Sequence, residues 1–126
     1  MAAPRFSVLA ALLLCACAHS QAEKNIKVES QVEGCFTLQN IALDTSKEPV
    51  LATALININT ATTDCPCKSA VMKYMAYQKK DGNNFDLLSG QFSILGKESV
   101  ALPIAVQKQL IFPDIPIYLF LSCSNN

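Results

Sequence analysis

Apolar and polar residues alternate in short runs from residue 26 onward, and turn-forming residues separate these runs. Short alternating runs are typical of half-buried β-strands, and no window shows the apolar period of a helix. The pattern predicts strands over residues 26–32, 36–41, 50–58, 70–78, 85–94, 99–102, 105–112 and 117–123. We therefore predict an all-β domain.

Two local signals sharpen this prediction. The clearest hairpin lies at residues 81–84, where Gly and Asn accept the positive φ that a tight turn requires. Residues 117–121 are continuously apolar, which is typical of a strand that lies centrally in a sandwich. In the strand predicted over residues 70–78, both faces carry apolar side chains, so neither face is wholly polar.

The number and length of the predicted strands favour one type of all-β fold. Seven or eight short strands in roughly 100 residues indicate an immunoglobulin-like β-sandwich, although the Trp usual in its core is missing from this chain. A small β-barrel is the alternative, because the turns do not discriminate between the two. A chain of 126 residues holds one core, so we predict a single domain over residues 23–126.

The amino-terminal residues 1–22 have the features of a secretory signal, with Arg5 ahead of an apolar run that is too short to span a bilayer. Small residues allow ordinary cleavage before Glu23. Alternatively, the sequence Leu-Cys-Ala before Cys17 resembles a bacterial lipobox, so that residues 1–16 are removed and Cys17 carries lipid. We expect a periplasmic or secreted protein, either soluble or anchored to the outer membrane through Cys17.

Charge and composition exclude several functions. Ten basic and ten acidic side chains give no basic field for nucleic acid or an anionic membrane. Without residues 1–22, nine lysines face ten acids, a net charge of −1, and the chain keeps no Arg and no His. Ser-His-Asp and Cys-His mechanisms, a His-bearing zinc site and an arginine clamp are then excluded. We expect no enzyme, no cofactor and no nucleic-acid partner.

Four cysteines follow the signal: Cys35, Cys65, Cys67 and Cys123. An even number in a small exported domain favours two structural disulfides. A bond between Cys65 and Cys67 is disfavoured, because residues two apart in extended chain lie about 6.6 Å apart, near the limit of disulfide geometry. Cys35 and Cys123 are therefore each expected to form a disulfide with one member of that pair. Both arrangements stay open: Cys35 with Cys65 or Cys35 with Cys67, and Cys123 with the other cysteine.

A second interpretation uses Cys65 and Cys67 as thiols. With Met72 and Met75 they form a soft sulfur set of the type that suits Cu(I). The two methionines have opposite parity on a strand, so both reach one ion only if a bulge intervenes. Disulfide exchange is less favoured, since the usual redox motif has two residues between its cysteines and this chain has only Pro66.

The sequence also carries a family resemblance. The Cys-x-Cys-Lys-Ser motif at residues 65–69, with Leu-Pro-Ile-Ala at 102–105 and Ser-Cys at 122–123, resembles a family of small exported bacterial proteins classed as a domain of unknown function. The resemblance covers about residues 35–123, and Pro66 stands where the family pattern has Gly. It implies export, a cysteine-bearing β fold and no established activity, and it supplies no catalytic residue.

These observations favour a non-enzymatic cell-envelope domain, stabilised by disulfides, that binds another protein or a periplasmic ligand. Its only expected membrane attachment is a lipid on Cys17. The alternative is a periplasmic copper-binding or thiol-redox protein that uses Cys65 and Cys67.

Overall fold

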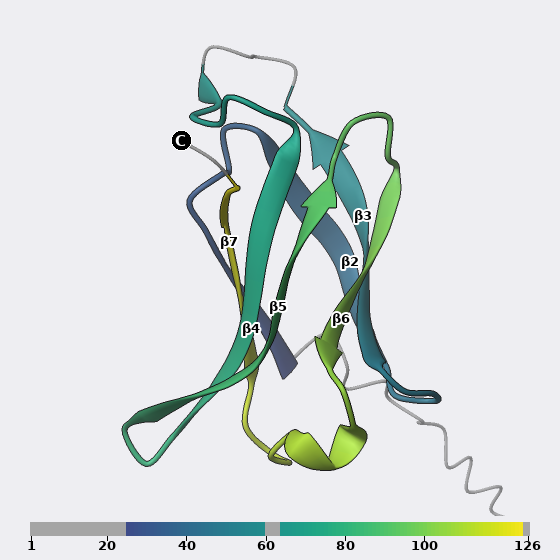
Figure 1. The fold of residues 1–126 in the computed structure, drawn as a ribbon, viewed down its shortest axis with the longest axis vertical. Coiled ribbons are helices and arrows are strands. Elements are labelled where there is room, and N and C mark those ends of the chain that lie inside the picture. Colours follow the sequence, from purple (N-terminus) through teal and green to yellow (C-terminus); the bar gives the residue numbers. More distant parts are fainter. Residues whose placement is uncertain (1–24, 60–63, 125–126) are drawn as a thin grey trace, which may run out of the picture.

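The computed structural model describes residues 25–59 and 64–124, which form two β-sheets packed face to face (Figure 1). The strands are β1 (Ile26–Ser30), β2 (Phe36–Asp44), β3 (Val50–Ile58), β4 (Val71–Lys80), β5 (Asn83–Ser93), β6 (Ser99–Ala105) and β7 (Ile117–Cys123). One sheet has the order β1-β7-β4-β5 and the other β2-β3-β6. The predicted all-β sandwich is confirmed, and the sheets do not close into the alternative barrel.

Strand β7 lies inside the four-stranded sheet, parallel to β1 and antiparallel to β4. Its alternate residues Ile117, Leu119 and Leu121 are buried in the core, as expected of this continuously apolar run. Tyr118 and Phe120 point to the opposite, outer face and are half-buried. Burial in the core therefore accounts for the apolar side chains on the inner face of β7, while Tyr118 and Phe120 give its outer face aromatic side chains.

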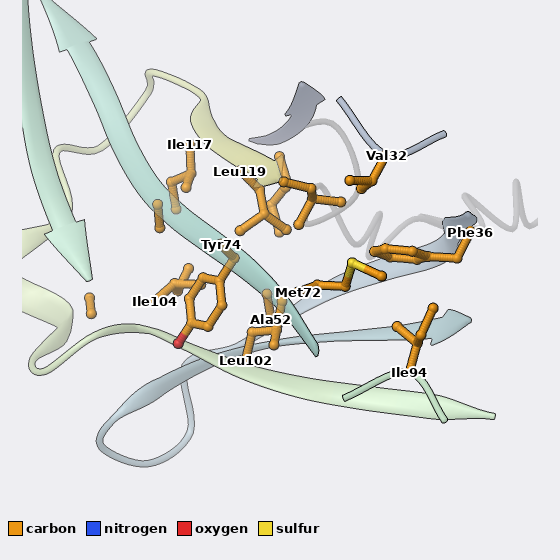
Figure 2. Packing of buried hydrophobic residues seen from close by; sticks show 14 of the residues in the cluster. Val32, Phe36, Ala52, Met72, Tyr74, Ile94, Leu102, Ile104, Ile117 and Leu119 are labelled. Carbon is orange, nitrogen blue, oxygen red and sulfur yellow. The ribbon is translucent and has the colours of Figure 1, made fainter. Parts of the chain in front are cut away.

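The core lies between the two sheets, and Figure 2 shows its packing. Its largest fully buried apolar side chains are Phe36, Met72, Ile104, Ile117, Leu119, Leu121, Val32 and Val50. Tyr74 of β4 reaches across the core and donates a hydrogen bond of 2.7 Å from its hydroxyl to the carbonyl oxygen of Pro103 in β6. This bond satisfies a buried polar group and joins the two sheets.

Strand β2 is longer than predicted, because the alternation changes phase within it. The register with β3 shifts between Gln39 and Ala42, and Asn40 adopts a φ of 54°. A β-bulge adds a residue to one strand and so changes which residues face the core. Leu38 and Leu43, which have opposite parity, thus both pack against the core.

The predicted strand over residues 105–112 is wrong. Strand β6 continues to Ala105, and the following residues form a turn that contains the 3₁₀ helix η3 (Lys108–Leu110). The apolar residues Val106 and Leu110 of this stretch are both exposed. The strand predicted over residues 99–102 continues through Pro103, because β6 is an edge strand, where a missing N–H does not break a ladder.

The hairpin predicted at residues 81–84 is confirmed. Asp81 and Gly82 form a two-residue turn between β4 and β5, with φ values of 54° and 79°. Two successive residues with positive φ match the twist of the adjoining strands.

Candidate functional site

The outer face of the four-stranded sheet carries an ordered set of aromatic and apolar side chains. The register between β4 and β7 places Tyr77 beside Tyr118 and Met75 beside Phe120. The residues between them, Ala76 and Leu119, are buried in the core. Since strand side chains alternate between faces, the four residues Met75, Tyr77, Tyr118 and Phe120 project away from the core together. We call these four residues the aromatic face.

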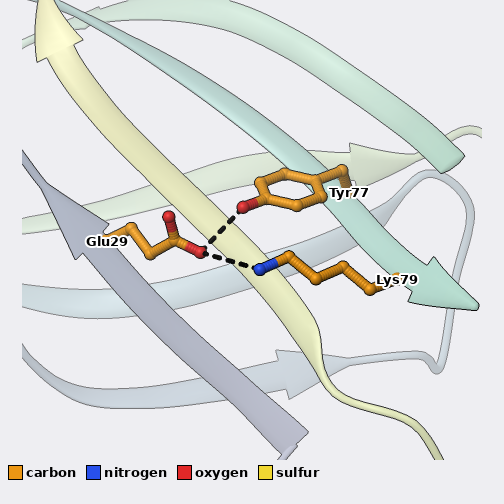
Figure 3. A network of polar contacts seen from close by, with 3 residues as sticks. All are labelled: Glu29, Tyr77 and Lys79. Carbon is orange, nitrogen blue, oxygen red and sulfur yellow. Dashed lines mark hydrogen bonds and ion pairs between the residues drawn. The ribbon is translucent and has the colours of Figure 1, made fainter. Parts of the chain in front are cut away.

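A polar network holds one end of the aromatic face (Figure 3). The rings of Tyr77 and Tyr118 stack with centroids 5.3 Å apart. The Tyr77 hydroxyl donates a hydrogen bond of 2.7 Å to Oε1 of Glu29 in β1. Lys79 Nζ lies 4.0 Å from the same carboxylate and 4.4 Å from the centroid of the Tyr118 ring. Residues from three adjacent strands thus fix the orientation of both rings.

The hydrogen bond from Tyr77 to Glu29 raises the pKa of Tyr77 to about 12, with desolvation and the charge of Glu29 as further causes. Because this pKa exceeds the ordinary value of 10.0, the neutral phenol is favoured by folding. The resulting stabilisation is present below pH 10 and is lost as the pH rises through about 12.

The Glu29→Ala variant should therefore ionise Tyr77 at lower pH, nearer the ordinary value of 10.0. The measurement is a pH titration of phenolate ultraviolet absorbance, compared between the variant and the parent protein. Glu33→Ala, at an exposed residue outside the network, is the control and should leave the titration unchanged. An identical curve for Glu29→Ala would show that the hydrogen bond to Glu29 does not raise the pKa of Tyr77.

A hollow of about 400 Å³ includes part of the aromatic face, Met75 and Phe120. Its lining includes the apolar side chains of Met75 and Phe120 and four polar side chains: Lys73, Ser89, Gln91 and Ser122. Ser89 and Gln91 lie on β5, directly opposite Met75 and Lys73. The hollow therefore continues the aromatic face across β7, β4 and β5.

The four cysteines meet at the end of the sandwich where β2 begins and β7 ends. Cys35 is bonded to Cys65, and Cys67 to Cys123, which is one of the two pairings left open by the sequence. Between β5 and β7 the chain crosses the sandwich once, in β6, so β7 returns to the end that holds Cys35. A Cβ on Gly34 would overlap the carbonyl of Asp64, so the backbone needs Gly here to bring Cys35 to Cys65.

The sulfur set considered for copper is only partly brought together. Cys65 and Cys67 lie at the cysteine end, and the Sδ atom of Met72 is 3.7 Å from the Sγ atom of Cys67. Met75 lies on the outer face and is 41% exposed, while Met72 is fully buried. No register shift occurs between these two residues, so Met75 is not part of the cluster.

Sequence reasoning did not find the aromatic face. One sign of it is present in the sequence, because the alternate positions of residues 70–78 that face outward include Met75 and Tyr77. The pairing of this strand with Tyr118 and Phe120 depends on strand order and register, which the pattern did not provide. The predicted lipidation residue Cys17 and the signal at 1–22 lie outside the described residues.

Comparison with known proteins gives a family. The family described as "Uncharacterized protein conserved in bacteria (DUF2195)" matches residues 9–126. No curated protein and no solved structure matches the chain. Within residues 25–59 and 64–124, no helix has the length and apolar character needed to cross a membrane. Because the match spans most of its length, the chain belongs to this family of uncharacterised bacterial proteins.

Proposed function

We propose that this protein is a non-enzymatic binding module of the bacterial cell envelope, and that its aromatic face holds a partner protein. The observation that carries the proposal is the paired arrangement of Tyr77 with Tyr118 and of Met75 with Phe120 on one outer face. Interfaces combine an apolar centre with a polar rim and are enriched in Tyr, Phe and Met. The aromatic face and its surrounding polar residues have this composition.

The geometry favours a macromolecular partner over a small ligand. The hollow is half open to solvent and lies on the outer surface of a sheet, whereas small ligands bind in concave sites that enclose most of their surface. Tyr77 and Tyr118 are held by Glu29 and Lys79, so binding costs little ordering of these side chains. Charged groups of both signs at the rim supply complementarity to a protein partner.

Location in the envelope is supported by the signal-like residues 1–22 and by the two disulfides, which persist in oxidising compartments. The mature chain then begins at Glu23 or carries lipid on Cys17. Intact mass of the exported protein distinguishes these two forms, because acyl chains add a characteristic mass. The non-enzymatic assignment rests on the chain after residue 22, which has no His and no Arg.

Site-specific photo-crosslinking in the exporting bacterium tests the binding surface. A photoreactive amino acid at position 75 or 120 should give the same covalent adduct, because both positions face the partner. Leu55 provides the matched control, since it is 46% exposed but lies on β3, in the other sheet. Placing Asp at position 118 should reduce the adduct from position 75 about tenfold, as expected for an anchor at the centre of an interface.

Two results would contradict this proposal. Equal adducts from positions 55 and 75 would indicate non-specific capture, and no adduct from positions 75 and 120 would indicate that the face is unoccupied. A folded Tyr118→Asp protein is required for the comparison, and circular dichroism of the purified variant checks this.

A further inference from the structure

Five sulfur atoms gather at the cysteine end of the sandwich. The Sγ atoms of Cys35, Cys65 and Cys67 all lie within 4.8 Å of one another. The fourth cysteine, Cys123, is bonded to Cys67, and the Sδ atom of Met72 is 3.7 Å from the Sγ atom of Cys67. The fold therefore holds the two disulfides side by side with a thioether against one of them.

This spacing is close to what one metal ion requires. A metal–thiolate bond is about 2.3 Å long, so two sulfurs on one ion are at most about 4.6 Å apart. Reduction lets the bonded sulfurs of Cys35 and Cys65 move apart toward this separation, and the Sγ atom of Cys67 already lies within 4.8 Å of both. We propose that the reduced protein binds one Cu(I) ion through the thiolates of Cys35, Cys65 and Cys67, with the thioether of Met72 as a further ligand.

The ligand chemistry selects Cu(I). Thiolate and thioether sulfurs are soft donors that favour Cu(I), and imidazole is missing from the chain after residue 22. Met72 pairs with Cys123 across β4 and β7, and its side chain is fully buried, so the thioether is held at the cluster rather than free to leave it. Figure 2 shows this side chain inside the core.

The site requires reduction, because the disulfides use every cysteine sulfur in the cluster. A dithiol reductant supplies two electrons and two protons to each disulfide, giving two thiols, and is itself oxidised to a disulfide. Cu(I) then replaces the thiol protons, which pass to solvent, and its oxidation state does not change. Disulfide formation and metal binding are thus mutually exclusive, so oxidation of the thiols releases the ion.

Competition with a chromophoric Cu(I) chelator, bicinchoninate, tests this inference. The mature exported protein is reduced with a dithiol under anaerobic conditions, freed of reductant and titrated with Cu(I) against the chelator. We expect one Cu(I) per chain, and we expect Met72→Leu to weaken retention at least about tenfold, the effect of losing even an outer-shell partner of a metal ligand. Met75→Leu is the matched control and should leave retention unchanged, since Met75 faces away from the cluster.

The substitution of Met by Leu conserves volume, so both variants should fold. Circular dichroism of each reduced protein verifies this before the titration. If Met72→Leu and Met75→Leu retain Cu(I) equally, the inference is overturned. The ion would then be held by thiolates alone or by an unfolded chain. Loss of copper to the chelator by the parent protein would also overturn it. The crosslinking experiment uses the oxidised protein and a different face, so either proposal can fail while the other stands.

Discussion

Replacing Cys67 and Cys123 together by Ser is expected to lower the free energy of unfolding by about 4 kcal/mol. Their bond closes a loop with a sequence separation of 56, and a cross-link stabilises chiefly by restricting the unfolded chain. The bond also fixes the last residue of β7, the strand that lies between β1 and β4. Urea-induced unfolding at equilibrium measures the loss.

The other disulfide supplies a matched comparison. Cys35 and Cys65 close a loop with a separation of 30, and this loop does not overlap the first in sequence. The Cys35→Ser, Cys65→Ser protein should therefore lose roughly 0.5 kcal/mol less than the Cys67→Ser, Cys123→Ser protein. A loss below about 1 kcal/mol for either pair would contradict the loop-closure account.

Much of the fold was predictable because most strands have one face in the core. Strands β3 and β7 have the predicted bounds, and the ends of β1, β4 and β5 differ by only a few residues. The errors occur where burial does not follow alternation. In β2 the bulge near Asn40 changes the phase, and after Ala105 the apolar residues Val106 and Leu110 are exposed rather than packed.

The sites were less predictable because they depend on contacts between distant segments. The preference of Cys35 for Cys65 over Cys67 follows from the close approach of Gly34 to Asp64, which spacing along the chain does not reveal. Likewise, the aromatic face exists only because Tyr77 and Tyr118 are brought into register. Strand parity alone did predict that Met72 and Met75 lie on opposite faces, because no bulge intervenes.

Gln78 is the buried polar side chain whose loss should matter most. Its Nε2 atom donates to the carbonyl oxygens of Phe112 and Ile115 at 3.0 and 3.3 Å, and its Oε1 atom accepts from the N–H of Phe112 at 2.8 Å. The side chain is fully buried on β4, next to Ile117 of β7. It therefore ties the turn after β6 to the four-stranded sheet by three hydrogen bonds.

The Gln78→Met variant keeps the length of this side chain but removes all three hydrogen bonds. It should lower the free energy of unfolding by about 3 kcal/mol, since each buried backbone group left without a partner costs about 1–3 kcal/mol. Gln39→Met, at an exposed residue of β2, is the control and should change stability by less than about 0.5 kcal/mol. Limited proteolysis under native conditions supplies a second readout, because the freed turn should be cleaved faster between Val106 and Pro116. Unchanged cleavage together with a loss below about 1 kcal/mol would show that core packing, and not Gln78, holds this turn in place.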